Sequence, residues 1–225
     1  MSQQIAEITW SKDGVPVSDR YDDPYFSLQN GMEETRHVFL RGNQLPNRFR
    51  DGFHIAELGF GTGLNFLTTL LEWRNSGASG RFRFTSFEAF PLSGKDIAKA
   101  LDLFPVLHES ASDLCNVWNT AGGVFEVAGD VTLNVVVGDA RDRLKNWGGR
   151  ADAWFLDGFS PAKNPELWSE SLLHQVANCT AEEGTFATYT AAGFVRRALS
   201  EAGFDVQRVE GFGRKRHMTV GRLKS

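Results

Sequence analysis

The chain has 225 residues, of which 41% are apolar and 12% aromatic, enough for one sizeable hydrophobic core, so we expect a single main domain with an elaboration. Its formal net charge of −4 gives no overall sign of a nucleic-acid partner. No apolar run approaches the roughly 18 residues of a membrane span. Because the N-terminus also lacks a signal-peptide layout, we expect a soluble, cytoplasmic protein with no membrane partner.

The two cysteines, Cys115 and Cys179, lie far apart with no paired spacing. Neither a disulfide framework nor a zinc site is therefore supported. We expect both to be small buried hydrophobic residues, and we expect no metal.

Residues 1–50 form an irregular first segment. Residues 8–18, ITWSKDGVPVS, predict a hairpin over Asp13–Gly14, and residues 21–46 are dense in aromatic and charged side chains. Such a segment can cap the sheet and line a site, or it can be a structural cover alone. The sequence favours neither alternative.

From residue 53 onward, strand patterns alternate with helical ones. We predict helices over 63–73, 93–105, 164–179 and 191–203, and residues 108–121 are compatible with a further helix. Asn164 and Pro165 are suited to cap and start the helix over 164–179. We predict strands over 53–58, 81–88, 151–157, 184–190, 204–211 and 216–223, and a hairpin over 124–139 that turns at Gly129–Asp130.

The repeated order of strand, helix and strand predicts an α/β domain with a mainly parallel sheet. A turn of five residues, 211–215, joins the last two strands when they are counted as 204–210 and 216–222. This turn is too short for a helical crossover, so these strands should be antiparallel. In a parallel sheet, ligands bind beyond the carboxyl ends of the strands, near the point where the strand order reverses. The residues at those ends therefore indicate the site.

A glycine-rich loop, ELGFGTG (57–63), follows the first of these strands. Alternate glycines let the backbone turn tightly and approach a ligand closely, which a Cβ atom would prevent. The loop departs from the dinucleotide-binding fingerprint, because Leu64 stands where that pattern has Gly or Ala. It therefore fits an uncharged nucleoside with an amino-acid tail better than a pyrophosphate.

Glu57 in this loop is followed by acids at the ends of three later strands, Glu88, Asp139 and Asp157. Glu88 can accept two hydrogen bonds from a ribose diol, and Asp139 can accept one from the exocyclic amine of adenine. Each acid alone is weak evidence, since strand-end acids are common surface residues. Four such strands in succession, three with glycine beside or soon after the acid, favour a binding site.

These features resemble those of the class I S-adenosylmethionine-dependent methyltransferases. Five blocks look more narrowly like the methyltransferase domain of the bacterial MnmC enzymes, namely YFSLQNGMEETRHVFLRGN, ELGFGTGLNFL, DAWFLDGFSPAKNPELW, AGFVRRAL and GFGRKRHM. They span nearly the whole chain in order. The resemblance implies a Rossmann-like fold with a mainly parallel, seven-stranded sheet whose last strand is antiparallel, plus an N-terminal extension.

The resemblance also implies a reaction, the methylation of the primary amine of 5-aminomethyl-2-thiouridine at the tRNA wobble position to 5-methylaminomethyl-2-thiouridine. S-adenosylmethionine is the implied methyl donor. The implied partners are the tRNA anticodon stem-loop and the upstream enzymes that install the aminomethyl group. In many bacteria this domain is fused to a flavin-dependent oxidoreductase domain that prepares the amine, for which this sequence has no counterpart. Flavin chemistry is therefore not assigned to it, and either another enzyme supplies the amine or the sequence is a portion of a longer product.

The resemblance further implies which segments bind the cofactor. Residues 51–225 would form the S-adenosylmethionine-binding domain, and residues 1–50 would contribute to the site. The implied cofactor-binding residues are Glu57, Gly59, Phe60, Gly61, Thr62, Gly63, Glu88, Asp139 and Ala140. Asn30 and Glu34 are implied at the amino-acid tail, where Glu34 would face the ammonium group.

An alkylammonium has a pKa of roughly 10, so its nitrogen must lose a proton before it can attack a methyl group. A carboxylate orients the amine but favours its protonated form, whereas desolvation among aromatic rings acts the other way. We expect Asp157, with the backbone of Gly158 and Phe159, to hold the amine, and Phe159 or Phe26 to stack on the uracil. The alternative is that Asp157 only ends the strand and caps the next turn.

The main basic run, Arg214, Lys215 and Arg216, lies on the predicted last turn. Charge alone favours the interpretation that this is an ordinary solvated turn. The resemblance instead favours an RNA-binding turn, because cations would contact the tRNA phosphates while the reacting base enters the pocket. Secondary candidates are Arg36, Arg196 and Arg197. Lys163 is either a phosphate contact or a solvated loop tip.

Two other functions stay open. A methyltransferase acting on a small-molecule or protein amine would share the site, and the basic turn would then be incidental. A nucleotide-binding module, or an NAD-dependent oxidoreductase, would use the same loop for another ligand.

Overall fold

The computed structural model describes residues 4–27 and 30–224, and an eight-stranded sheet runs through its centre in the order β10-β11-β9-β8-β4-β5-β7-β6. Its strands are β4 (Phe53–Leu58), β5 (Phe82–Glu88), β6 (Gly123–Ala128), β7 (Val131–Val137), β8 (Ala151–Leu156), β9 (Thr180–Thr188), β10 (Phe204–Glu210) and β11 (His217–Leu223). Strands β4, β5, β7, β8 and β9 are parallel, and β11 is antiparallel to both β9 and β10.

The expected mainly parallel sheet with an antiparallel last strand is confirmed, and it carries one strand more than the seven expected. The additional strand is β6, which pairs antiparallel with β7 at the sheet edge. It is the first arm of the predicted hairpin, so the hairpin joins the sheet instead of contributing a single strand.

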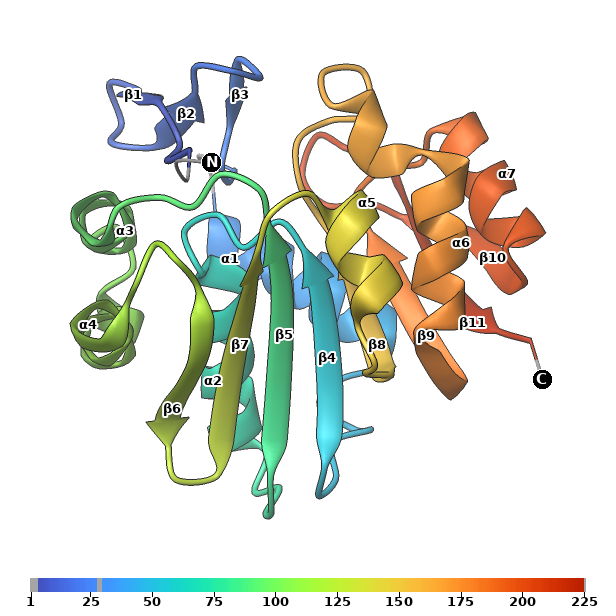
Figure 1. The fold of residues 1–225 in the computed structure, drawn as a ribbon, viewed down its shortest axis with the longest axis horizontal. Coiled ribbons are helices and arrows are strands. Elements are labelled where there is room, and N and C mark those ends of the chain that lie inside the picture. The colour runs from blue at the N-terminus through green and yellow to red at the C-terminus, as the bar shows by residue number, and fades with distance from the viewer. Residues whose placement is uncertain (1–3, 28–29, 225) are drawn as a thin grey trace.

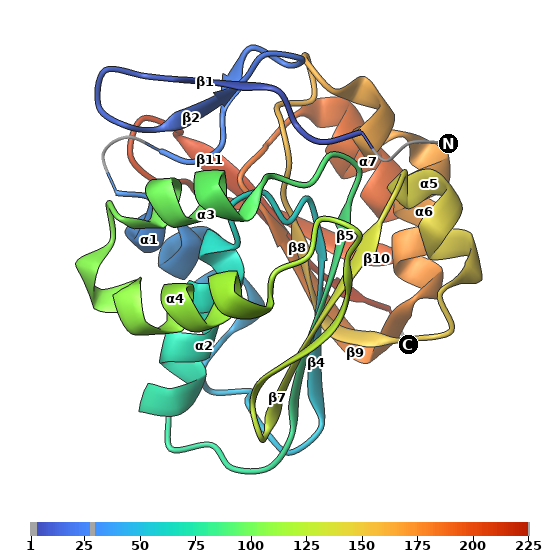
Figure 2. The same ribbon diagram turned by 60° about the vertical axis from the view of Figure 1, so that its left-hand side comes forward.

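Helices cover both faces of the sheet (Figures 1 and 2). One face carries α1 (Gly31–Glu34), α2 (Leu64–Asn75), α3 (Gly94–Leu101) and α4 (His108–Val117), and the other carries α5 (Ala140–Arg143), α6 (Glu170–Asn178) and α7 (Gly193–Glu201). Short helical turns are η1 (Thr35–Leu40), η2 (Arg41–Asn43), η3 (Pro105–Leu107), η4 (Leu144–Asn146) and η5 (Pro165–Trp168). None of the helices in the described part of the chain has the length and apolar character needed to cross a membrane.

Two hydrophobic clusters fill the layers on either side of the sheet. On β8, Phe155 belongs to the cluster beneath α2, whereas Trp154 and Leu156 belong to the cluster beneath α6 and α7. Successive strand residues point to opposite faces, which explains why a continuous apolar run is buried on both sides. Cys115 and Cys179 are unpaired as expected, but both are only partly buried.

The helix predicted to start at Asn164 begins later. Residues 165–168 form the turn η5, and α6 starts at Glu170 with Ser169 as its N-cap. Asn164 makes no side-chain capping bond. The buried Trp168 donates its Nε1 hydrogen to the carbonyl oxygen of Phe159, which ties η5 to the loop after β8 and separates it from α6.

The predicted N-terminal segment divides into two parts. Strands β1 (Ile8–Trp10), β2 (Pro16–Ser18) and β3 (Asp23–Pro24) form a separate small sheet above the carboxyl ends of the parallel strands (Figure 1). The predicted hairpin is present as β1 and β2, with Gly14 at a φ of 77° in its turn. The second part, α1 with η1 and η2, is buried in the main core through Val38, Phe39 and Leu40.

His54 on β4 is a buried titratable group outside the cavity described below. Its Nδ1 lies 3.0 Å from the carbonyl oxygen of Arg150 and so carries the hydrogen, while its Nε2 lies 2.9 Å from the Thr85 hydroxyl and accepts from it. Burial, together with repulsion from Arg83, lowers the pKa of His54 to about 4. The fold therefore requires the neutral ring.

We expect acid to destabilise the protein through His54. The unfolded chain protonates this ring below about pH 6.5 and the folded protein only below about pH 4, so stability falls as the pH drops between these values. The loss that His54 contributes from pH 7 to pH 5 should be about 2 kcal/mol. Urea unfolding at the two pH values checks this against His54→Gln, which cannot titrate. An equal loss in both proteins would contradict it.

Candidate active site

A cavity of about 1210 Å³ lies beyond the carboxyl ends of the parallel strands. It occupies the point where the strand order reverses, because β4 lies between β5 and β8. Its wall includes the following residues predicted from the sequence: Phe26, Glu34, Gly59, Phe60, Gly61, Thr62, Glu88, Asp139, Ala140, Asp157, Gly158, Phe159, Lys163, Arg214 and Lys215. The sheet topology thus brings together side chains from distant parts of the chain.

The glycine loop leaves β4 and enters α2. Gly59 has a φ of 84°, and a Cβ atom there would lie 3.3 Å from the Cα of Gly158. The loops after β4 and β8 therefore approach each other as closely as two backbones can. Gly61 has a φ of 54°, and a Cβ atom there would lie 3.1 Å from the ring of Tyr25.

Glu88, at the end of β5, shapes this loop as well as lining the cavity. Its Oε2 accepts from the backbone N–H of Gly61 at 2.9 Å, and its Oε1 accepts from that of Phe90 at 2.8 Å. Burial raises the pKa of Glu88, and the backbone donors act against that rise. Each carboxylate oxygen keeps a further lone pair with which it can accept from a ligand.

Asp157 directly follows β8 and faces the cavity. Its Oδ2 accepts from the side-chain amide of Asn65 at 2.7 Å. Burial raises the pKa of Asp157 to about 6, although the hydrogen bond from Asn65 and the charge of Lys215 lower it. A carboxyl group with a pKa this close to neutrality can both accept and release a proton.

Glu57 lies on β4, fully buried and outside the cavity wall. Its Oε1 accepts from Asn65 at 2.9 Å, and its Oε2 accepts from the hydroxyl of Ser86 at 2.7 Å. Burial raises the pKa of Glu57 well above its ordinary value. The structure therefore does not bring this carboxyl group to a ligand as predicted, because both oxygens face protein groups.

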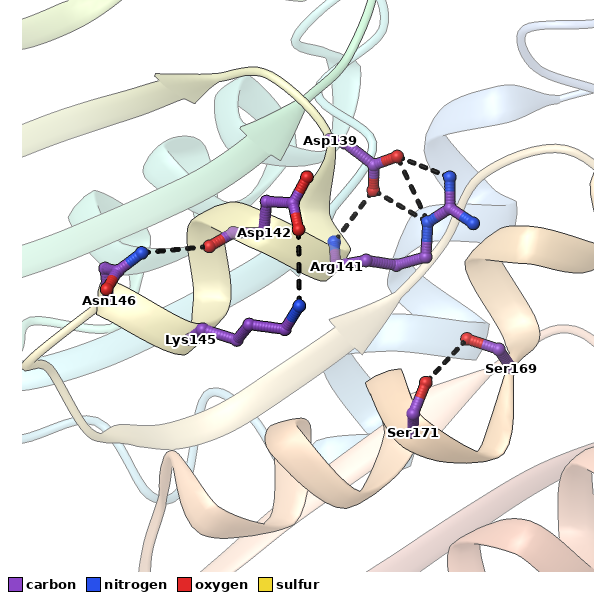
Figure 3. A network of polar contacts seen from close by, with 7 residues as sticks. All are labelled: Asp139, Arg141, Asp142, Lys145, Asn146, Ser169 and Ser171. Carbon is purple, nitrogen blue, oxygen red and sulfur yellow. Dashed lines mark hydrogen bonds and ion pairs between the residues drawn. The ribbon is translucent and has the colours of Figure 1, made fainter.

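Asp139 is engaged by Arg141, as Figure 3 shows. It caps α5 by accepting from the backbone N–H of Arg141 at 2.9 Å, and the guanidinium donates to both carboxylate oxygens. The hydrogen bonds from Arg141 lower the pKa of Asp139. An adenine amine at this position would share the carboxylate with Arg141, which also lines the cavity.

Aromatic rings form the wall beside Asp157. The ring of Tyr21 stacks on Phe159 with centroids 4.7 Å apart, and Tyr25 meets Phe159 nearly at right angles at 5.1 Å. One face of Phe159 is therefore already covered, which limits its predicted stacking on a base. Phe26 packs against Phe104 at 5.3 Å.

Polar contacts join this wall to the small N-terminal sheet. The backbone N–H of Ser160 donates to the carboxylate of Asp23 at 2.9 Å. Lys163, one of whose predicted roles was a phosphate contact, binds the carbonyl oxygen and the carboxylate of Asp22. We call these contacts, with the rings of Tyr21 and Phe159, the N-terminal latch.

Lys215 and Glu34 bind each other across the cavity wall. The Nζ of Lys215 lies 2.8 Å from Glu34 Oε1 and 4.0 Å from the centroid of the Tyr189 ring. The hydroxyl of Tyr189 donates to the carbonyl oxygen of Gly158 at 2.8 Å. Lys215, predicted to meet RNA, is thus paired with the residue predicted to bind the cofactor tail, although its side chain is still exposed, as is that of Arg214 on the same turn.

The remaining predicted residues lie outside the cavity wall. Asn30 caps α1 by accepting from the backbone N–H of Glu33, and Arg36 forms ion pairs with Glu33 and Glu72. The others outside the wall are Glu57, Gly63, Arg196, Arg197 and Arg216.

The cavity wall also contains residues that were not predicted, among them Asn65, Tyr21 and Tyr189. Asn65 is a polar side chain on a buried helix position, a pattern that signals a hydrogen-bonded role. Tyr21 and Tyr189 lack such a signal, because neither lies in a regular element and an aromatic residue in a loop has no preferred partner.

The glycine-loop side of the cavity can bind a nucleoside, and the Asp157 side can accept a proton from an amine. The glycine loop and Glu88 offer backbone and carboxylate groups, and Asp157 faces the cavity beside aromatic rings. Within residues 4–27 and 30–224, no group of three or more His, Cys, Asp or Glu side chains is arranged to hold a metal ion.

Comparison with known proteins points to one class. The model of a family described as S-adenosyl-L-methionine-dependent methyltransferase matches residues 105–224. The "tRNA 5-methylaminomethyl-2-thiouridine biosynthesis bifunctional protein MnmC" of Leptospira borgpetersenii serovar Hardjo-bovis is 46% identical over 97% of this chain and 35% of its own length. The protein of the same name from Hahella chejuensis is 47% identical over 96% of this chain and 36% of its own.

The chain thus spans about a third of the length of the curated relatives it matches. A crystal structure of MNMC2 from Aquifex aeolicus has a TM-score of 0.76 and 29% identity, covering 100% of this chain and 72% of that one. These similarities confirm the resemblance predicted from the five sequence blocks.

Proposed function

This chain belongs to the family of S-adenosyl-L-methionine-dependent methyltransferases, and from that premise we propose that it methylates the primary amine of 5-aminomethyl-2-thiouridine at the tRNA wobble position. The observation that carries the proposal is the position of Asp157, whose carboxyl group faces the cavity between the glycine loop and an aromatic wall. The name shared by the relatives, a tRNA 5-methylaminomethyl-2-thiouridine biosynthesis protein, supports the choice of acceptor.

The residues at the glycine loop fit the cofactor. Gly59 and Gly61 leave the backbone uncovered where a Cβ atom would meet neighbouring groups, so the loop can lie against a flat nucleoside. Glu88 is held by two backbone donors and can accept from the ribose diol. Asp139 and Ala140 would line the adenine side and Glu34 the side of the amino-acid tail, since all three residues line the cavity. When bound, S-adenosylmethionine supplies a methyl group carried on a sulfonium.

Asp157 would orient the acceptor amine and take its proton. An alkylammonium with a pKa of roughly 10 lies about six units above an ordinary aspartic acid. Because burial raises the pKa of Asp157 from 3.8 to about 6, the gap narrows to roughly four units, which lowers the cost of proton transfer by about 3 kcal/mol. Desolvation beside Phe159 lowers the amine pKa further.

The two ends of the chain would complete the acceptor side. Within the predicted segment 1–50, we propose that residues 4–27 cover the base through the N-terminal latch, because Tyr21 and Asp23 contact the loop after β8. Arg214, Lys215 and Arg216, with Lys163, Arg196 and Arg197 as further candidates, would meet RNA phosphates. We propose that upstream enzymes install the aminomethyl group on the same tRNA, and that the methylation takes place in the cytoplasm.

A transfer assay tests the proposal. The protein is incubated with labelled S-adenosylmethionine and either tRNA carrying 5-aminomethyl-2-thiouridine or tRNA lacking the aminomethyl group. We expect label only in the first RNA, and digestion should locate it on the wobble nucleoside. Equal labelling of both RNAs would refute the acceptor assignment, and labelling of free amines alone would favour a small-molecule methyltransferase.

The proposed RNA contact of the basic turn 214–216 can be tested separately. Arg214→Gln should weaken tRNA binding and reduce the slope of log affinity against log salt by about one. Lys145→Gln is the control, because Lys145 is an exposed residue that pairs with Asp142 and lies outside the cavity wall. The salt dependence of tRNA binding by this variant should equal that of wild type. Filter binding across a salt series measures both. An unchanged slope for Arg214→Gln would remove this turn from the RNA surface.

A further inference from the structure

Asn65 occupies a position between two carboxyl groups that lie on neighbouring strands. Its side-chain Nδ2 is 2.7 Å from Asp157 Oδ2, beyond β8, and 2.9 Å from Glu57 Oε1, on β4. An amide nitrogen carries two hydrogens, so Asn65 can donate one to each acid. Both amide hydrogens of Asn65 are therefore donated, one to Asp157 and one to Glu57.

The amide is held in this orientation from its other end. Asn65 Oδ1 lies 2.7 Å from the hydroxyl of Thr35, which also lies 3.1 Å from the carbonyl oxygen of Gly31. Thr35 is 2% exposed and Asn65 is 8% exposed, so water does not compete freely for these groups. If the amide turned over, its oxygen would face two carboxyl oxygens, an arrangement that both repulsion and lost hydrogen bonds oppose.

We propose that Asn65 is a positioning residue for methyl transfer, holding the Asp157 carboxyl group so that its remaining lone pairs face the acceptor amine. The proposal rests on the proposed function for its chemistry, but the Asn65 contact can be tested without it. Asn65, which also lines the cavity, acts in this role through Asp157.

The groups around Asp157 show why such a donor is needed. Glu34 from α1 raises its pKa, and Lys215 from the last turn and the backbone N–H of Gly158 lower it. Two neighbouring carboxyl groups cannot both be charged at low cost, since like charges repel. Burial raises the pKa of Glu57 well above its ordinary value, although the hydrogen bonds from Ser86 and Asn65 lower it, so Glu57 keeps a proton more readily. Asn65 then stabilises the charge on Asp157.

The test replaces the amide with an apolar group of similar size. In Asn65→Leu, the pKa of Asp157 should rise by about one to two pH units, because a hydrogen bond to the charged form is lost. Carbon NMR of labelled aspartate measures this pKa. The acid limb of the kcat profile should move by the same amount, and activity should recover partly at high pH. The KM for S-adenosylmethionine should stay within about threefold.

Thr68→Val is the matched control. Thr68 lies one turn further along α2, is fully buried, and has a hydroxyl with no hydrogen-bond partner in the described part of the chain. Neither the Asp157 ionisation nor the pH profile should change in this variant. If Asn65→Leu does not fold, Thr35→Val takes its place, since it removes the hydroxyl that fixes Asn65 Oδ1 and should raise the pKa of Asp157 by less.

Two readouts separate the possible failures. If the pKa of Asp157 in Asn65→Leu, or in Thr35→Val where that variant is used, equals the wild-type pKa, the proposed role of Asn65 is wrong, whatever the activity. A shifted ionisation without any methyl transfer by wild-type protein would instead refute the proposed function and leave the contact established.

Discussion

Asp157→Asn should lower the rate of methyl transfer at neutral pH by about a hundredfold to ten-thousandfold, the usual contribution of a group that moves a proton in the reaction. The affinity for S-adenosylmethionine should remain within a few-fold of wild type. The reason is that asparagine keeps the shape of the side chain but cannot take a proton, whereas the glycine loop and Glu88 are unaltered. Single-turnover transfer from labelled cofactor and titration calorimetry measure the two quantities.

Asp142→Asn is the control for this change. Asp142 is an exposed acid on α5 that pairs with Lys145 and lies outside the cavity wall, so its loss should leave the rate unaltered. A parallel loss of transfer and cofactor binding in Asp157→Asn would support the alternative that Asp157 only caps the turn after β8. Thermal unfolding of both variants separates that outcome from general instability.

Glu88→Ala should weaken the binding of S-adenosylmethionine by about tenfold to a hundredfold, as expected when hydrogen bonds to a buried charged group are lost. Two effects combine, because the ribose loses its acceptor and the N–H groups of Gly61 and Phe90 lose theirs. The loop that leaves β4 then loses one of the hydrogen bonds that hold it. Calorimetric titration with the cofactor measures the change in affinity.

Glu126→Ala, on the exposed edge strand β6, is the matched control for Glu88→Ala and should bind the cofactor as wild type does. Saturating cofactor should restore most of the rate in Glu88→Ala, since the acceptor side of the cavity is unchanged. Wild-type affinity in this variant would contradict a ribose contact by Glu88.

The sequence predicted the parts of the site that follow from strand order. Parallel strands end at one edge, so Glu88, Asp139 and Asp157 had to meet there once the alternation of strands and helices was recognised. Glycines with a φ above zero are similarly predictable from spacing, because few other residues accept that conformation. These features depend on local pattern and on a topology that many chains share.

The parts that were missed depend on contacts between distant residues. The pairing of Lys215 with Glu34 joins residues 181 positions apart, and charge alone does not say which partner a lysine takes. The stacking of Tyr21 on Phe159 has the same character. Glu57 was predicted to bind the cofactor, but it is fully buried, and whether a strand-end acid faces a ligand depends on the side chains that pack around it.

The N-terminal latch and the pair of Lys215 with Glu34 also govern when a cavity first exists during synthesis. The glycine loop and Glu88 are translated early and lie close in the chain, but Asp23 waits for Ser160, 137 residues later, and Glu34 waits for Lys215. A nascent chain can therefore form the nucleoside side of its site while the amine side is still open. The amine side of the site is complete only when the last strand has left the ribosome.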